Sequence, residues 1–222
     1  MYNKLSNQIK LKKIENASDE NQKYHHLIKL KDSYLEKIGW IRSIQDNACV
    51  DSDGNPIPWI SYPAYHFLEQ RLPRELTVFE YGTGNSTLWF STRAAHVYSV
   101  DHDLEWHEKI KEKISNANVT CLYEKLEYGG KYGKKVLEID KLFDIIMIDG
   151  RDRVNCIYNS VNKLKNDGII ILDNSDRDAY APGMDFLKNR EFRRIDFTGF
   201  APLSYWKIMT TIFYRKFNIL DI

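Results

Sequence analysis

Two patterns of apolar residues follow one another along the chain. Between residues 22 and 44 the apolar positions recur at roughly helical spacing within a polar stretch, which predicts one helix; they are Leu27, Ile28, Leu30, Tyr34, Leu35, Ile38 and Ile41. Residues 46–61 are rich in Asp, Gly, Asn and Pro, which is typical of a loop. We therefore expect an N-terminal helical extension and linker over residues 1–60 and one domain over residues 61–222.

Beyond residue 61, short apolar runs alternate with amphipathic stretches. They predict strands at 76–81, 95–100, 119–123, 143–148 and 168–172, and helices at 85–95, 103–115, 153–165 and 178–189. Strands separated by helices form right-handed βαβ units, so we expect a doubly wound α/β fold with a mainly parallel sheet covered on both faces. The runs at 192–197 and 208–214 have no helix between them, which indicates an antiparallel strand pair at one edge.

Composition and charge exclude several classes of protein. The 32 basic and 31 acidic residues give a net charge of +1, whereas a dedicated nucleic-acid binder normally carries a clear excess of Lys and Arg. The longest aliphatic runs, at 145–148 and 169–172, are far shorter than the about 20 apolar residues of a membrane span. The N-terminus lacks the apolar core of a signal peptide, and three widely spaced cysteines indicate free thiols. We expect a cytoplasmic protein that binds neither nucleic acid nor membrane.

A glycine-rich turn follows the first predicted strand of the domain. The sequence Glu80-Tyr81-Gly82-Thr83-Gly84 runs from a strand into a helix, with Asn85 or Ser86 near the helix start. Glycine permits a tight turn and close approach of the backbone to a ligand. The third glycine of the dinucleotide-binding fingerprint is absent, because Thr87 holds that place. The turn therefore indicates a ligand site, and a purely structural turn is the alternative.

An acidic residue ends the second predicted strand of the domain. Asp101 lies 21 residues after Glu80, where α/β proteins bind the hydroxyl groups of a ribose. Its carboxylate can accept hydrogen bonds from two hydroxyls. The alternative is that Asp101 caps the helix that begins near Leu104, and the two roles are compatible.

These residues resemble the motifs of class I S-adenosylmethionine-dependent methyltransferases. The resemblance covers roughly residues 60–215 and includes two further segments, Phe143–Gly150 and Gly168–Asn174. It implies a Rossmann-like, seven-stranded sheet of order 3-2-1-4-5-7-6. It also implies that the S-adenosylmethionine is bound by residues of the turn and of the second strand end: Glu80 at the methionine ammonium, Gly82, Gly84 and Asn85 along the ligand, Asp101 at the ribose and His102 near the adenine.

A second acidic group lies at the ends of the fourth and fifth predicted strands. Asp149, Asp173 and Asn174 are similar in position to the Mg²⁺ ligands of the catechol O-methyltransferase group, so the resemblance implies a possible Mg²⁺ site. That group has a lysine base three residues after the first ligand, whereas this chain has Asp152. We therefore consider Asp149, Asp152 and Asp173 as candidate catalytic bases. The alternative is that these acids cap helices or form ion pairs with Arg151, Arg153 and Arg177.

The sequence thus favours an S-adenosylmethionine-dependent methyltransferase that acts on a small molecule, with an oxygen atom as the expected acceptor. An NAD-dependent oxidoreductase and a non-catalytic binding or scaffold protein on the same fold are the alternatives. The aromatic segment 198–206 either forms a wall of the substrate site or packs around a hairpin. The sequence determines neither the acceptor molecule nor the oligomeric state.

Overall fold

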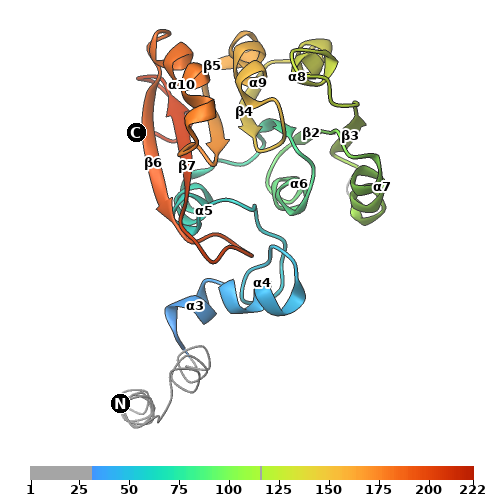
Figure 1. The fold of residues 1–222 in the computed structure, drawn as a ribbon, viewed down its shortest axis with the longest axis vertical. Helices are drawn as coiled ribbons and strands as arrows, with labels where there is room; N and C mark the ends of the chain where they lie inside the picture. Colours follow the sequence, from blue (N-terminus) through green and yellow to red (C-terminus); the bar gives the residue numbers. More distant parts are fainter. Residues whose placement is uncertain (1–31, 116) are drawn as a thin grey trace.

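A single seven-stranded sheet organises the protein (Figure 1), whose computed structural model describes residues 32–115 and 117–222. Its strands, in the order β3-β2-β1-β4-β5-β7-β6, are β1 (Thr77–Tyr81), β2 (His96–Asp101), β3 (Val119–Tyr123), β4 (Phe143–Ile148), β5 (Leu164–Asp173), β6 (Arg193–Gly199) and β7 (Ile208–Tyr214). Strands β1 to β5 pair in parallel, and β7 is antiparallel to both β5 and β6. The predicted strand order and the antiparallel edge pair are confirmed.

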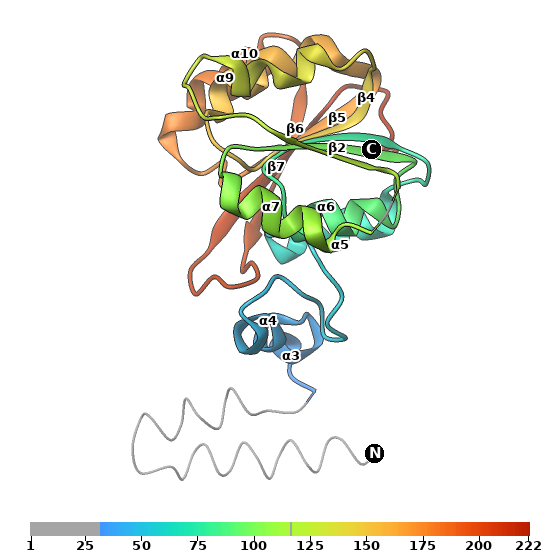
Figure 2. The same ribbon diagram turned by 90° about the vertical axis from the view of Figure 1, so that its right-hand side faces the viewer.

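Helices cover both faces of the sheet (Figures 1 and 2). α5 (Tyr62–Arg71), α6 (Asn85–Ser91) and α7 (Leu104–Lys113) lie on one face, and α8 (Lys131–Lys134), α9 (Arg153–Ser160) and α10 (Ala181–Lys188) lie on the other. Within residues 32–115 and 117–222, no helix is both long and apolar enough to cross a bilayer.

The two faces of the sheet have separate hydrophobic cores, because successive side chains of a strand point to opposite faces. In β4, Ile145 and Met147 pack on the side of α5 and α6, and Ile146 and Ile148 pack on the side of α8, α9 and α10. All residues of β4 are buried, as expected for a strand that is covered on both sides. This double burial explains the nearly continuous apolar run from which the strand was predicted.

The region before residue 47 differs from the single predicted helix. Its described part forms two short helices, α3 (Tyr34–Lys37) and α4 (Trp40–Asp46), and residues 22–31 lie outside the described residues. Gly39 separates the helices with a φ of +84°, which L side chains rarely adopt. A Cβ at Gly39 would lie 2.5 Å from the backbone carbon of Asp51. The loop after α4 therefore leaves no room for a side chain at position 39, and glycine marks the break between the two helices.

Several boundaries within the domain also differ from the prediction. α6 ends at Ser91, before the predicted residue 95. α9 ends at Ser160 and a 3₁₀ turn follows, so β5 begins at Leu164, which pairs with Phe143 across an irregular register. The sequence pattern did not predict α5, although Ser61 caps it and Pro63 lies in its first turn.

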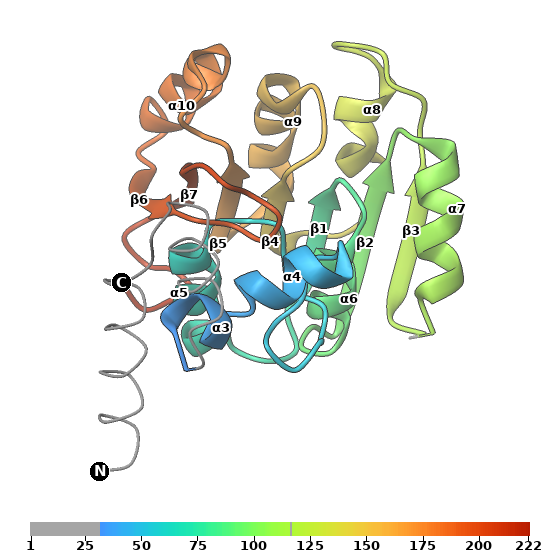
Figure 3. The same cartoon turned by 60° about the horizontal axis from the view of Figure 1, so that its bottom comes forward.

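The loop between β6 and β7 lies near the carboxyl ends of the parallel strands (Figure 3), and Cys49 O of the segment 47–61 accepts a hydrogen bond from Asn85 at the start of α6. β7 starts beside the end of β5, since Thr210 pairs with Asp173, and the loop therefore projects beyond that end. The indole nitrogen of Trp40 in α4 donates a hydrogen bond to Ser204 O at 2.9 Å, and Tyr62 N donates to Phe200 O at 2.8 Å. These contacts join the N-terminal segment to the edge of the sheet at which α/β proteins bind ligands.

Candidate functional site

The glycine turn after β1 is a tight connection that depends on its glycines. Gly82 has a φ of +98° and donates from its N–H to Val100 O of β2 at 2.8 Å. A Cβ at Gly82 would lie 3.2 Å from Gly150 N, so the turn is packed against the end of β4. Gly84 N donates to Thr87 Oγ1 at 3.0 Å. Thr87, at the place of the missing third glycine, therefore caps the first turn of α6.

Glu80 is a fully buried acid directly below this turn. Its Oε2 accepts a hydrogen bond from Thr87 Oγ1, whereas Oε1 is buried and has no hydrogen-bond partner within the described part of the chain. Burial raises the pKa of Glu80 to about 7, although the hydroxyls of Ser86 and Thr87 lower it, and the charge of Asp101 adds to the rise. An unpaired buried carboxylate oxygen is costly, which makes Glu80 a candidate partner for a positively charged ligand group.

Asp101 joins the ends of β1 and β2. Its Oδ2 accepts from Thr83 N at 2.8 Å, and its Oδ1 accepts from the backbone N–H groups of His102 and Asp103 at 2.7 and 2.9 Å. The expected closeness of the glycine turn and this acid is therefore found. A carboxylate offers about four acceptor positions, so Asp101 retains about one for a ligand hydroxyl. His102 follows directly, with its Nδ1 3.3 Å from Asp101 Oδ1.

Asn85 points toward the N-terminal segment in the structure. Its side-chain amide donates to Cys49 O at 2.6 Å, which fastens the loop after α4 to the start of α6. On the other side of the turn, the Trp106 indole donates to Thr83 O. Nothing in the sequence pattern had indicated that Cys49 and Trp106 would enclose the glycine turn, because they become neighbours only through the tertiary fold.

Asp149 and Asp173 meet at the ends of β4 and β5, as their positions in the sequence predicted. The side chain of Asp149 is 23% exposed and its Oδ1 accepts from Arg153 Nη2 at 3.0 Å. Asp173 is buried and its Oδ1 accepts from Thr210 Oγ1 at 2.6 Å. Burial raises the pKa of Asp149 to about 6, against the opposing effect of Arg153 and with a further rise from Glu80. The pKa of Asp173 lies well above its usual range because of burial and the charge of Asp149.

The predicted Mg²⁺ site is not supported. Among residues 32–115 and 117–222, no group of three or more His, Cys, Asp or Glu side chains has an arrangement that could hold a metal ion. Arg153 contacts Asp149 and the backbone of Asp173, so the ion-pair alternative agrees with the structure. Asn174 turns the chain away from β5 with a φ of +48°, and its carbonyl accepts from Arg177 N. Asp149 and Asp173 therefore contact the guanidinium group of Arg153 and are not arranged as metal ligands.

Asp152 is engaged with the segment that precedes β4. Its Oδ2 accepts from Gly129 N at 2.8 Å and its Oδ1 from Asn155 Nδ2 at 2.7 Å. Tyr81 OH and Asn159 Nδ2 hold the same segment through Gly133 O, at 2.8 and 2.9 Å. Residues 125–142 include α8 and a 3₁₀ turn over Lys135–Glu138, and these hydrogen bonds tie the segment to the domain.

A cavity of about 450 Å³ lies away from the glycine turn. It is bounded by the 51–57 loop, by Tyr65 of α5 and by the outer side of α6, with Arg93 and Lys113 at its border. None of the acids described above lines it. The chemistry at the strand ends and this cavity are therefore separate features.

Three solved structures share this fold at low sequence identity. A putative methyltransferase from Streptococcus mutans, in complex with SAH, is 14% identical with a TM-score of 0.52 over 68% of this chain and 95% of its own. An rRNA methylase from Streptococcus thermophilus is 15% identical with a TM-score of 0.55, over 69% and 97%. A precorrin-6y C5,15-methyltransferase from Geobacter metallireducens is 16% identical with a TM-score of 0.52, over 69% and 88%.

Comparisons of the sequence itself give no relatives. No protein-family profile matches the chain, and no curated protein sequence matches it. The likeness is therefore one of architecture, and it agrees with the strand order and the antiparallel edge pair described above. The chain has the Rossmann-like fold of the class I methyltransferases.

Proposed function

We propose that the protein is an S-adenosylmethionine-dependent methyltransferase that acts on an oxygen atom of a small molecule. The observation that carries this proposal is the buried Glu80, whose Oε1 has no partner in the described chain and which lies directly below the glycine turn. A buried carboxylate is stabilised by a cationic ligand group. The ammonium group of S-adenosylmethionine is such a group, and the fold is one that methyltransferases use.

The charge of the site favours this ligand over NAD. Glu80 and Asp149 interact electrostatically across the end of β1 and β4. The pyrophosphate of a dinucleotide carries negative charge, so this pair of acids would repel it from the glycine turn. Thr87, which replaces the third glycine, hydrogen-bonds Glu80 and so keeps the acid in place. The same residues thus support a cationic ligand and disfavour a dinucleotide.

Five residues around the turn would hold the cofactor: Glu80 at the ammonium group, Gly82 and Gly84 along the amino-acid and ribose parts, Asp101 at a ribose hydroxyl and His102 beside the adenine. Bound S-adenosylmethionine supplies an electrophilic methyl group. Asp101 can take a hydroxyl with its remaining acceptor position while it keeps its three backbone hydrogen bonds. Asn85 keeps a supporting role through Cys49 O.

Asp149 is the best placed of the three candidate bases. It is 23% exposed, whereas Asp173 is buried against Thr210 and Asp152 holds Gly129 N. A pKa of about 6 makes Asp149 a stronger base than an ordinary carboxylate, while it stays largely ionised near neutral pH. In the step that we propose, the acceptor oxygen forms its bond to the methyl carbon, the electron pair of the broken carbon–sulfur bond stays on sulfur, and the acceptor proton passes to Asp149.

The loop between β6 and β7 supplies an aromatic wall that leads into the strand paired with the end of β5. Phe200, Tyr205 and Trp206 are 44%, 65% and 68% exposed, and the loop leads into β7 two residues before Thr210, the partner of Asp173. The Trp40 ring supports the loop, with centroid distances of 6.1 Å to Phe200 and 5.8 Å to Tyr205. We propose that exposed aromatic rings in this position stack on a ring of the acceptor.

The near-balance of charge favours a small acceptor over a nucleic acid, which normally requires a basic surface. Because one structural neighbour is an rRNA methylase, RNA belongs among the acceptors to be tested. A screen of hydroxylated metabolites and total RNA with labelled S-adenosylmethionine separates the two. Transfer to RNA alone would overturn the proposed acceptor class and retain methyl transfer.

Calorimetric titration tests the cofactor. We expect S-adenosylhomocysteine to bind the wild-type protein, NAD to show no binding, and Glu80→Gln to weaken S-adenosylhomocysteine binding by about tenfold or more, since a charge-assisted hydrogen bond is lost. Glu112→Gln, an exposed position on α7, is the matched control and should bind normally. Binding of NAD without S-adenosylhomocysteine would reject the proposal, as would full binding by Glu80→Gln.

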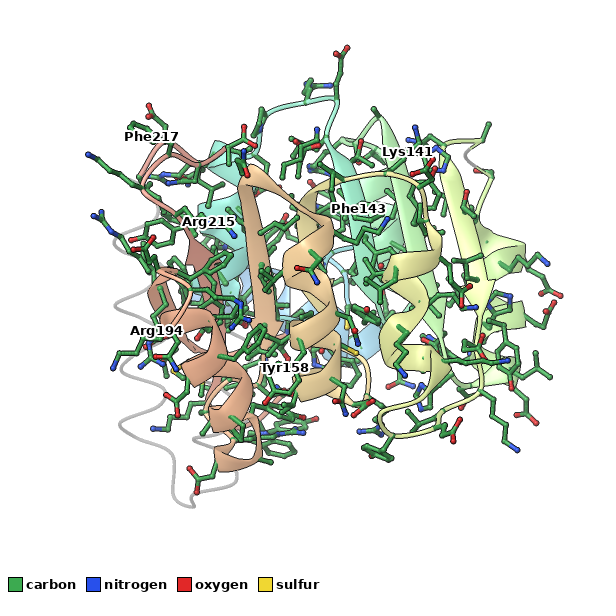
Figure 4. All side chains as sticks on the ribbon, turned by 90° about the horizontal axis from the view of Figure 1, so that it is seen from above. Lys141, Phe143, Tyr158, Arg194, Arg215 and Phe217 are labelled. Atoms are coloured by element: carbon green, nitrogen blue, oxygen red, sulfur yellow. The ribbon has the colours of Figure 1, made fainter. Side chains whose placement is uncertain are left out.

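The aromatic wall has its own test once an acceptor is known. Trp206→Ala and Tyr205→Ala should raise the KM for the acceptor and leave S-adenosylhomocysteine binding unchanged. Phe217→Ala is the control, because Phe217 is 77% exposed and follows the far end of β7 (Figure 4). Equal effects of all three variants would contradict the assignment of this wall.

A further inference from the structure

Arg153 occupies the point where the carboxyl ends of β4 and β5 meet. Its side chain is 6% exposed and reaches back from the first residue of α9. Nε donates to Gly150 O at 3.0 Å, and Nη2 donates to Asp149 O at 2.8 Å and Asp149 Oδ1 at 3.0 Å. Nη1 donates to Asp173 O. One guanidinium group therefore fastens the ends of both strands and pairs with an acid between them.

The acids around this cation have a permanent counter-charge. Asp149 interacts electrostatically with Glu80 and with Asp173 at the strand ends, and Arg153 lowers the pKa of both aspartates. An arginine side chain remains protonated at all physiological pH values. The ring of Tyr180 lies 5.3 Å from the guanidinium carbon and adds an aromatic contact. Arg153 thus supplies, from within the chain, the positive charge that the buried aspartates require.

A divalent ion would compete with Arg153 for the same oxygen atoms. Mg²⁺ requires about six oxygen ligands in nearly octahedral geometry. The guanidinium group already uses four of the nearby oxygens, Gly150 O, Asp149 O, Asp149 Oδ1 and Asp173 O. Thr210 uses Asp173 Oδ1. An ion among these atoms would also lie beside a like charge in a poorly solvated place, which is strongly unfavourable.

We propose that Arg153 is the resident cation of this site in place of a divalent metal, and that the acceptor is therefore bound without chelation. The binding of the acceptor without chelation rests on the proposed methyl transfer, whereas the role of Arg153 as the resident cation does not. A metal site selects acceptors with two adjacent oxygen atoms, because both bind the ion. A site with a fixed guanidinium imposes no such requirement, so the substrate class includes molecules with one isolated hydroxyl group.

The experiment uses Mn²⁺ as the probe, with the amount of free ion measured by electron paramagnetic resonance in ligand-free protein. Wild type is expected to bind no Mn²⁺ at the strand ends. Arg153→Ala is expected to bind it with a Kd at least about tenfold below the highest Mn²⁺ concentration at which wild type shows no binding, because the buried acids lose their counter-charge. Arg151→Ala is the matched control: Arg151 is exposed in the same turn, and its loss should change nothing.

The wild-type titration decides the question even if Arg153→Ala does not fold. Binding of Mn²⁺ by wild type that Asp149→Asn abolishes would overturn the proposal. Binding that Asp149→Asn leaves unchanged would lie elsewhere and would agree with it. Arg153→Lys keeps a positive charge and is expected to exclude the ion like wild type. Since these measurements need no cofactor, their outcome is independent of the binding of S-adenosylhomocysteine that tests the proposed function.

Discussion

Replacing Glu80 with Gln removes a negative charge that the fold holds in a fully buried position. The pKa of Glu80 rises from its usual 4.5 to about 7 on folding, mainly because burial disfavours the charged form. The folded state therefore binds this proton more tightly than the unfolded state. The contribution of Glu80 to stability is greatest below about pH 4.5 and is lost as the pH rises through about 7.

The size of this loss follows from the difference in pKa. At about 1.4 kcal/mol for each pKa unit, the rise from 4.5 to about 7 corresponds to about 3 kcal/mol of stability at alkaline pH. Between about pH 5.5 and about pH 8.5, the linkage relation gives a change of about 2 kcal/mol. The Gln side chain has no charge to lose, and its buried NH₂ group adds a cost of about 1–3 kcal/mol that does not depend on pH.

The assay is urea unfolding of ligand-free wild type and Glu80→Gln at about pH 5.5 and about pH 8.5. We expect the free energy of unfolding of wild type, relative to that of the variant, to fall by about 2 kcal/mol between these two values. Asp149 and Asp173 are present in both proteins, so only the part of the Asp149 titration that depends on the charge of Glu80 differs in the comparison. A difference that is the same at both pH values would refute the argument that Glu80 is buried as a costly charge.

Three further substitutions test individual contacts of the site. Asp101→Asn should weaken S-adenosylhomocysteine binding by about tenfold or more in calorimetry, because three backbone donors and a ligand hydroxyl share that carboxylate; unchanged affinity would remove Asp101 from the ligand site. Gly150→Ala should lower the free energy of unfolding by about 1–3 kcal/mol, since the new Cβ would lie 2.0 Å from Tyr132 OH and 3.1 Å from Gly82 N; a stability equal to that of wild type would show that Tyr132 moves aside freely. Asp152→Asn should keep methyl transfer within about tenfold, because Asn tolerates the φ of +50° at this position and can still accept from Gly129 N; a loss of several orders of magnitude would identify Asp152 as the base.

The sequence was sufficient for the strands because their signals are local, whereas the order of the strands in the sheet was implied by the resemblance to class I methyltransferases. β3, β4 and β7 have the predicted bounds, since runs such as 143–148 are bounded by turn residues and need no distant partner to be recognised. Helix ends were less accurate, and the end of α9 shows why. Residues 161–165 were predicted as the end of a helix, but residues 161–163 form a 3₁₀ turn and the pairing of Leu164 with Phe143 starts β5 at residue 164.

The ordered acids at the strand ends were also visible in the sequence. Parallel strands end at the same edge, so Asp149 and Asp173 at the ends of β4 and β5 were expected to lie close together, and they do. Their pairing was not visible. Whether Asp149 pairs with an arginine or with an ion depends on the orientation of α9 and on the conformation of the Arg153 side chain. The spacing of residues in the sequence predicts neither the orientation nor the conformation.

What the sequence alone determined is the order of the elements and the edge of the sheet at which the acids gather, since both follow from the periodicity of apolar residues along one chain. What only the tertiary structure decided is the partner of each acid. Glu80 has one oxygen unpaired within the described residues, Asp152 accepts from Gly129 N, and Asp149 pairs with Arg153, which also donates to the backbone of Asp173. Burial and hydrogen-bond partners depend on the tertiary fold, and burial raises the pKa values of Glu80, Asp149 and Asp173.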